Sequence, residues 1–257
     1  MTFLALDWSG ARNPAGKLWL AEARDGHLHR LESFPSREAA IEAVVAYGRG
    51  DERVVAGFDF SFSLPLWFHE SSGVHSAPAP WQRVSEQGEA WLAACEPPFW
   101  GRPGKPRPEM PAPLRATEEA VGRIAAIKPK STFQVGGAGA VGTGSLRGMP
   151  YLLTLQRHGW AIWPFDVAGR LTAIEIYPRL LTGSVVKSRE AARRAYLESA
   201  PWALSAAHRG LAEASEDAFD AAVSALVMAA HAASLAALPE RQGLARREGE
   251  IWHPVTT

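Results

Sequence analysis

The chain has very little cysteine, since Cys95 is the only one among 257 residues. A single cysteine excludes an internal disulfide bond and any zinc site built from several cysteines. We expect Cys95 to be a small, buried, apolar side chain. The scarcity of cysteine is typical of a protein in a reducing cytoplasm, which is the location we predict.

The chain also lacks a net charge and a long uninterrupted apolar run. Its 27 Lys and Arg residues balance 27 Asp and Glu residues, which excludes the broad positive field of a nucleic-acid coat protein and requires any polyanion site to be local. The longest apolar run, 221–238, is alanine-rich and is broken by Ser224, His231 and Ser234. We expect it to form a buried helix of a soluble protein. The N-terminus has neither the basic region nor the apolar stretch of a signal peptide, so we predict no membrane partner.

Familiar phosphate-binding motifs are missing as well. The glycine-rich segment 133–148 lacks the Gly-Lys-Ser/Thr of a Walker loop and does not directly follow the first strand, as a Rossmann fingerprint would. It leads into a predicted helix over 149–158, and its glycines serve either backbone contact with an anion or tight packing. The histidines, including His208 and His253, show no metal-ligand spacing.

The apolar pattern that is present predicts an α/β fold. Strands are expected over 3–7, 17–22, 27–32 and 53–58, with a helix over 36–47 between the last two. Three strands with short links form an antiparallel meander, and the helix lets the fourth strand pair in parallel with the first. This β-β-β-α-β order is followed by an insertion rich in Trp and Pro, about 60–130. Such stretches are usually lids or linkers, and the tryptophans favour a cover packed on one domain spanning 1–257.

Acidic side chains accompany these buried elements. Asp7 and Asp59 each end a buried strand, where α/β sheets carry their chemistry, and Glu175 lies inside an apolar strand. Asp217 and Asp220 are three residues apart on one face of an alanine-rich helix. Apolar interiors accept charges poorly, so these acids indicate a bound cation. Helix capping is the alternative for the last two, with Ser215 as the N-cap and the acids in the first turns.

Several segments of the chain resemble a known family. They are Leu6–Ala11, Gly57–Pro65, Lys130–Gln134 with the glycine-rich segment, Glu175–Pro178, Asp217–Ala221 and Glu250–Pro254. Together they look like the bacterial family filed as domain of unknown function 429, which is predicted to be a ribonuclease H-like nuclease. The Asp-x-x-Asp-Ala step at Asp217 is also similar to that of RuvC-type Holliday-junction resolvases. The resemblance covers nearly the whole chain and implies a ribonuclease H-like mixed sheet flanked by helices.

The resemblance implies a metal-dependent nuclease that hydrolyses phosphodiester bonds of DNA or RNA. Asp7, Asp59, Asp217 and Asp220 would bind Mg²⁺ or Mn²⁺, because carboxylates are the ligands that hard divalent ions prefer. Glu175 would be a further ligand or a base just outside the ligand shell. The residues expected to contact the nucleic-acid backbone are Ser9, Lys128, Lys130, Gln134, Gly137 and Gly139. Tryptophans of the insertion are candidate stacking surfaces for unpaired bases.

Two other functions remain open. Asp7–Ala11 followed by Lys17 is compatible with the first phosphate loop of an actin-like small-molecule kinase, although the second phosphate loop and the adenosine motif of that family are not found. A non-catalytic module that binds nucleic acid or one metal would also retain these acids, and the neutral net charge favours it. The basic stretch 101–131 is either a solvated loop surface or a phosphate-binding surface.

Overall fold

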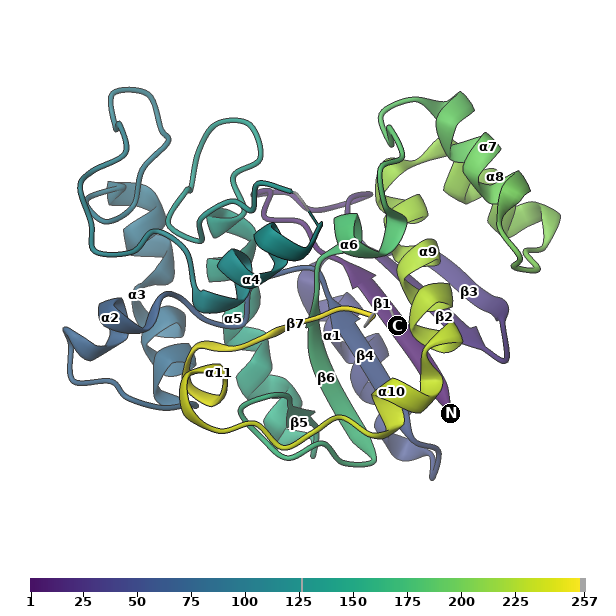
Figure 1. Cartoon of the computed structure of the whole chain (residues 1–257), viewed down its shortest axis with the longest axis horizontal. Coiled ribbons are helices and arrows are strands. Elements are labelled where there is room, and N and C mark those ends of the chain that lie inside the picture. The colour runs from purple at the N-terminus through teal and green to yellow at the C-terminus, as the bar shows by residue number, and fades with distance from the viewer. Residues whose placement is uncertain (126, 255–257) are drawn as a thin grey trace.

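One mixed β-sheet lies at the centre of the protein, with helices on both faces (Figure 1). The computed structural model describes residues 1–125 and 127–254. The described strands are β1 (Thr2–Asp7), β2 (Trp19–Arg24), β3 (His27–Ser33), β4 (Val54–Phe58), β5 (Ala161–Ile162), β6 (Leu171–Ile176) and β7 (Ile251–Trp252). Together they give an α/β fold, as the sequence predicts.

The order of strands across the sheet is β3-β2-β1-β4-β6-β5, and β7 also pairs with β6. The pairs β1–β2 and β2–β3 are antiparallel, while β1–β4 and β4–β6 are parallel. The predicted meander and the parallel return to the first strand are therefore confirmed. Parallel pairing brings the carboxyl ends of β1, β4 and β6 to one edge of the sheet, where α/β folds place their ligand sites.

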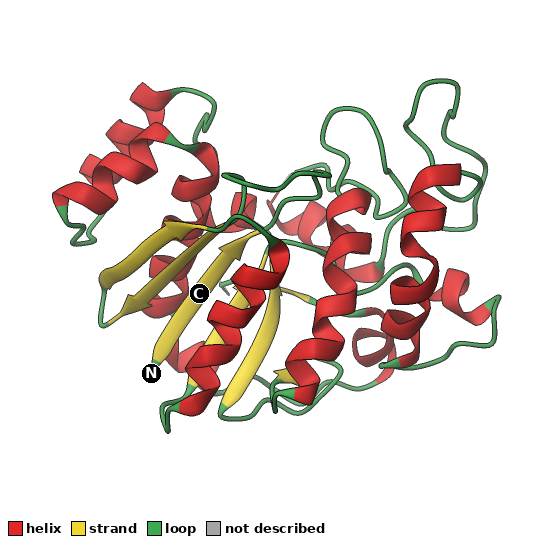
Figure 2. Cartoon of the chain, turned by 180° about the vertical axis from the view of Figure 1, so that it is seen from behind, coloured by secondary structure: helices red, strands yellow, loops and turns green. Residues whose placement is uncertain are grey.

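Helices cover the sheet on both faces, and the view from behind shows those on the second face (Figure 2). A short 3₁₀ turn, Tyr47–Arg49, follows the first helix. The described α-helices are α1 (Arg37–Ala46), α2 (Leu66–Glu70), α3 (Ala79–Ala94), α4 (Ala116–Ala125), α5 (Gly142–Arg157), α6 (Pro178–Thr182), α7 (Glu190–Ser199), α8 (Ala206–Ala214), α9 (Glu216–Ala230), α10 (Ala232–Ala236) and α11 (Gly243–Glu248).

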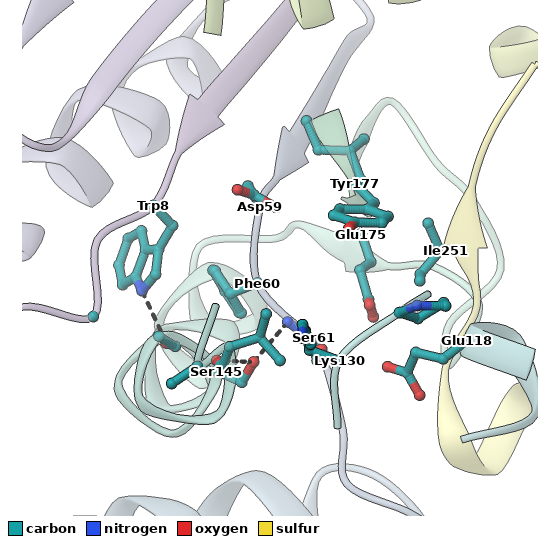
Figure 3. A pocket seen from close by; sticks show the side chains of 16 residues that line it. Trp8, Asp59, Phe60, Ser61, Glu118, Lys130, Ser145, Glu175, Tyr177 and Ile251 are labelled. Carbon is teal, nitrogen blue, oxygen red and sulfur yellow. Dashed lines mark hydrogen bonds between the residues drawn. The ribbon is translucent and has the colours of Figure 1, made fainter. Parts of the chain in front are cut away.

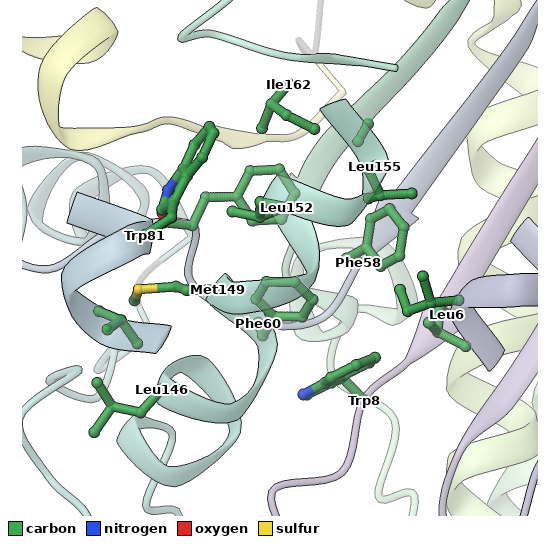
Figure 4. Packing of buried hydrophobic residues seen from close by; sticks show 14 of the residues in the cluster. Leu6, Trp8, Phe58, Phe60, Trp81, Leu146, Met149, Leu152, Leu155 and Ile162 are labelled. Atoms are coloured by element: carbon green, nitrogen blue, oxygen red, sulfur yellow. The ribbon is translucent and has the colours of Figure 1, made fainter. Parts of the chain in front are cut away.

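Alternation along β1 divides the interior into two cores. Leu4 and Leu6 belong to the core shared with α1, α3 and α5, part of which is seen in Figure 4, whereas Phe3 and Ala5 belong to the core under α9. Side chains of a strand point to opposite faces in turn, so a strand buried on both faces is apolar throughout. Cys95 is buried in the first core, as predicted.

The glycine-rich segment is in part a helix, which corrects the prediction that it is a loop up to residue 148. Helix α5 begins at Gly142 instead of Met149. A Cβ at Gly142 would lie 2.2 Å from the Thr132 carbonyl oxygen, and one at Gly148 would lie 2.5 Å from the Phe60 ring. These two glycines let α5 approach its neighbours closely, so at both positions tight packing explains the glycine.

The insertion after β4 is not an irregular lid, because it contains α2, α3 and α4. Its aromatic side chains Phe68, Trp81 and Phe99 share the first core with strand residues, so the insertion is built into the fold. Trp81 is fully buried and Trp100 is 9% exposed, which makes neither a stacking surface for bases. The tryptophan signal therefore reports core packing.

The apolar run 221–238 forms two helices instead of one, since α9 ends at Ala230 and α10 begins at Ala232. Among the described residues, no helix combines the length and the apolar character needed to cross a bilayer. Ser215 caps α9, because its side-chain oxygen accepts a hydrogen bond from the Ala218 amide at 3.2 Å. The predicted cap and the acidic pair are thus both present at this helix start.

Candidate functional site

Asp7 and Asp59 lie next to each other at the carboxyl edge of the sheet. Strands β1 and β4 pair with Leu6 opposite Phe58, and the Asp59 amide donates to the Leu6 carbonyl oxygen at 3.1 Å. Asp7 is 8% exposed and Asp59 is partly buried. In this parallel register the ends of β1 and β4, and with them Asp7 and Asp59, lie side by side.

Helix α9 brings Asp217 and Asp220 to the same place, because it packs over β1 and β2 with its first turns at the carboxyl edge. Asp220 is 5% exposed and Asp217 is partly buried. Burial and then the charges of Asp59, Asp220 and Asp217 raise the pKa of Asp7 well above its usual range. The charges of the other three acids thus act on Asp7, and we call these four side chains the acid cluster.

The other members of this acid cluster show the same effect. Burial and Asp220, partly opposed by Lys187, raise the pKa of Asp59 to about 7. Burial, opposed by Lys187, raises the pKa of Asp220 to about 6. Burial and Glu216 raise the pKa of Asp217. Ionisation of these carboxyls is therefore disfavoured in the folded protein, chiefly by burial.

Lys187 is the cation of the cluster, and the sequence analysis did not identify it. It lies on the loop between α6 and α7, and its ammonium forms an ion pair with Oδ2 of Asp220. Burial lowers the pKa of Lys187, but Asp220, Asp59 and Asp7 outweigh burial and raise it. Oδ1 of Asp220 is buried and accepts no hydrogen bond from any described residue. The only sequence signal was a lysine shortly before a helix, which is too common to mark a site.

Glu175 follows a different pattern from the four aspartates. Its Oε2 accepts hydrogen bonds from the Phe62 amide and from Nη1 of Arg115, each at 2.9 Å, and its Oε1 forms an ion pair with Nη2 of the same arginine. Arg115 is fully buried and also binds Glu118. Both oxygens of Glu175 are therefore engaged by donors of the protein, which leaves it poorly suited to be the predicted ligand or base.

The predicted backbone-contact residues divide into three groups. Ser9 accepts from the Ala11 amide at 3.2 Å and so stabilises its own turn. Gln134 donates to Gly136 and Ala138, and with the positive φ angles of Gly137 and Gly139 it shapes the glycine loop. Lys128 is exposed and does not line the cavity beside the acids, whereas Lys130 does line it.

A cavity of about 210 Å³ opens beside Asp59 (Figure 3). Trp8 lies on one side of it and Tyr177 with Ile251 on the other, while Asp59 lies between them. Lys130 and the start of α5 complete the wall. Of the predicted site residues, Asp59, Lys130 and Glu175 line this cavity, whereas Tyr177, which was not predicted, is placed there by the parallel pairing of β6.

As the side chains stand, no group of three or more His, Cys, Asp or Glu residues within 1–125 and 127–254 is arranged to hold a metal ion. The nearest approach to such a group is the acid cluster, in which Lys187 already pairs with Asp220. A search of family models, of curated proteins and of solved structures finds no match to this chain. Its function must therefore be argued from the geometry of this edge.

Proposed function

We propose that the protein is a metal-dependent nuclease with a ribonuclease H-like fold, acting on phosphodiester bonds of DNA or RNA in the cytoplasm. The observation that carries the proposal is the cluster of Asp7, Asp59, Asp217 and Asp220 at the carboxyl edge, where burial raises all four pKa values and neighbouring aspartates raise those of Asp7, Asp59 and Asp220 further. Lys187 forms an ion pair with only one of these acids, Asp220. Perturbed carboxyls of this kind are typical of functional sites, and their charge suits a cation.

The donor set suits Mg²⁺ or Mn²⁺. The candidate ligands are all carboxylate oxygens, which hard ions prefer, and the buried Oδ1 of Asp220 has no donor among the described residues. Asp7, Asp59, Asp220 and Asp217 would hold the ions. When bound, such ions supply an activated water and stabilise charge on the attacking and leaving oxygens.

The remaining groups of the site have roles that follow from their contacts. Lys187 neutralises Asp220 when no ion is present, and its loop must release that carboxylate for metal binding. Lys130 offers a positive charge for a phosphate at the rim of the cavity. Arg115 fixes Glu175 beneath the site, so Glu175 positions the floor of the cavity and does not act as a ligand.

Calorimetric titration of Mn²⁺ tests the proposal directly. We expect binding by the wild type and by D51N, a matched control in which the exposed Asp51 is changed, and no binding by D7N. The same samples should be assayed on branched DNA, single-stranded DNA and RNA, with cleavage by the first two proteins only. A wild type that binds no Mn²⁺, with or without nucleic acid, would refute the proposal.

A non-catalytic binding module on the same fold is the second candidate. The ion pair between Lys187 and Asp220 favours it, since a lysine can permanently replace a metal charge. In that case D7N would still bind nucleic acid, and neither D7N nor the wild type would cleave it. The two candidates are separated by whether Mn²⁺ produces cleavage that depends on Asp7.

A further inference from the structure

The cavity beside Asp59 offers a ligand a binding surface of a different kind from the acid cluster. Its walls are largely aromatic and apolar, from Trp8, Phe60, Tyr177 and Ile251. Its volume of about 210 Å³ is below the ~300–1,000 Å³ of pockets for drug-sized ligands. It therefore suits one flat ring system better than a larger molecule.

One wall of the cavity is held rigidly by hydrogen bonds. Nε1 of Trp8 donates to the Gly144 carbonyl oxygen at 3.0 Å. The Ser145 hydroxyl accepts from the Ser61 amide at 3.1 Å and donates to the Val141 carbonyl oxygen at 3.0 Å. Because these polar groups already have partners, what this wall offers to a ligand is mainly apolar surface.

The polar floor is likewise occupied by internal partners. Glu175 and Glu118 both line the cavity, but their carboxylates are bound by Arg115. A cationic ligand would thus find few free acceptors there apart from Asp59. Trp8 and Tyr177 lie on opposite sides of Asp59, as Figure 3 shows. Trp8 is 7% exposed and packs against Phe60, so the partly exposed Tyr177 is the aromatic ring that a ligand can reach. An accessible aromatic ring in a narrow cavity suits a planar base, since every nucleobase has a π-face.

The charges around the cavity suit the sugar-phosphate backbone of the nucleic-acid strand that carries such a base. Lys130 lies at the cavity with an exposed side chain and forms no ion pair or hydrogen bond with any described residue. A Cβ at Gly139 would lie 3.3 Å from Cε of Lys130, so the lysine stem lies along the glycine loop. A base in the cavity would place its sugar-phosphate between Lys130 and the acid cluster beside Asp59.

We propose that this cavity binds a single unpaired nucleobase of the substrate strand, so that the substrate is single-stranded or locally opened nucleic acid and not an intact duplex. This inference rests on the proposed nuclease function, because it places the phosphodiester next to the bound base at the acid cluster. Removing a base from a duplex costs stacking and pairing, which is least where the base is already unpaired. A free mononucleotide carries the same base chemistry, and the experiment separates the two sources.

The test uses a single-stranded oligonucleotide containing one 2-aminopurine, with the full chain and Ca²⁺ in place of Mn²⁺. We expect the wild type to quench 2-aminopurine fluorescence by stacking and Y177L to bind about tenfold more weakly or worse. Y47L is the matched control, since Tyr47 is also partly buried but lies beside Glu22, away from the carboxyl edge. K130M, at an exposed position, is expected to weaken binding and reduce its salt dependence while leaving the fold intact.

Each outcome decides the inference. Equal quenching by wild type and Y177L, equal binding of an intact duplex, or equally tight binding of 2-aminopurine mononucleotide would overturn it.

A cleavage assay in Mn²⁺ then compares a strand carrying one bulged base with one abasic at that position, and we expect cleavage only of the first. Equal cleavage of both would overturn the base site and leave the nuclease standing. Quenching that depends on Tyr177 without any cleavage would support the base site and refute the nuclease.

Discussion

Two buried groups of charges lie close together in this protein, and they are built in opposite ways. In the Arg115 network, all six carboxylate oxygens of Glu118, Glu175 and Glu248 accept a hydrogen bond from Arg115 or from a backbone amide. In the acid cluster, Oδ2 of Asp220 is the one carboxylate oxygen with a side-chain or backbone donor among the described residues. The first group is thus fully paired within the protein, whereas most carboxylate oxygens of the second have no such donor among the described residues.

Under the proposed function, this difference separates a structural charge from a functional one. A buried charge that is fully paired stabilises the arrangement around it, and removing one member leaves the rest unpaired. A cluster of like charges with too few partners costs stability and is retained where a ligand supplies the missing charge. Glu175 and Asp59 line the same cavity, yet the hydrogen bonds place them in different groups.

The largest effect should follow from R115M. It leaves Glu118 and Glu175 buried without their cation, and we expect the free energy of unfolding to fall by ~3–5 kcal/mol, as for other broken buried pairs. Urea denaturation measures the change. R102M, at an exposed loop position, should stay within ~0.5 kcal/mol of wild type. A loss below ~1 kcal/mol in R115M would show that the network is not structural and would remove the contrast.

D7N should act in the opposite direction. The folded pKa of Asp7 lies above its unfolded value, so its ionisation on raising the pH destabilises the folded state. Without metal, we expect D7N to raise the free energy of unfolding by ~1–3 kcal/mol at pH 8 while abolishing Mn²⁺ binding. A mutant that is less stable than wild type at pH 8 would assign Asp7 a structural role.

Thermal denaturation of the wild type across pH tests whether ionisation of these carboxyls lowers the stability of the folded state. The pKa of Asp59 rises from 3.8 to about 7 on folding, so its contribution to stability is present below about pH 4 and is lost as the pH rises to about 7. D59N should flatten the curve in this window. Saturating Mn²⁺ should restore stability at pH 7 in the wild type and not in D59N.

K187M should have a smaller effect, lowering stability while strengthening Mn²⁺ binding. It leaves the Asp220 carboxylate without its cation, which we expect to cost ~1 kcal/mol at pH 8. Because the lysine competes with an added cation, Mn²⁺ should bind roughly three- to tenfold more tightly, as calorimetry would show. K128M is the exposed control and should change neither quantity. Weaker Mn²⁺ binding by K187M would mean that the lysine supports the ion site.

D217N should change stability least. Asp217 is in the first turn of α9, where the helix dipole favours a negative charge by ~0.3–1 kcal/mol, but burial and Glu216 oppose its ionisation. These effects act in opposite directions, so we expect a change within ~0.5 kcal/mol together with weaker Mn²⁺ binding. A clear loss of stability with unchanged Mn²⁺ binding would favour the capping interpretation of this residue.

Much of the framework could be predicted because it depends on local patterns. The short apolar runs in 3–7 and 53–58 predict buried strands whose ends carry Asp7 and Asp59, and the parallel pairing follows from the helix between them. The helices of the insertion were missed, since its many Pro and Trp residues mask helical periodicity. The extent of α5 was missed because Gly142 and Gly148 are selected by contacts with Thr132 and Phe60.

The sequence by itself determined the order β-β-β-α-β, the strand ends that carry the acids and the cap of α9, since each depends on neighbours in the chain. Only the tertiary structure decided which charges are paired. Arg115 reaches Glu175 across 60 residues and Lys187 reaches Asp220 across 33, and no local pattern encodes such contacts. The burial of a charge and the identity of its partner are properties of the packed molecule, and here they separate the fully paired Glu175 from the aspartates for which we propose a cation.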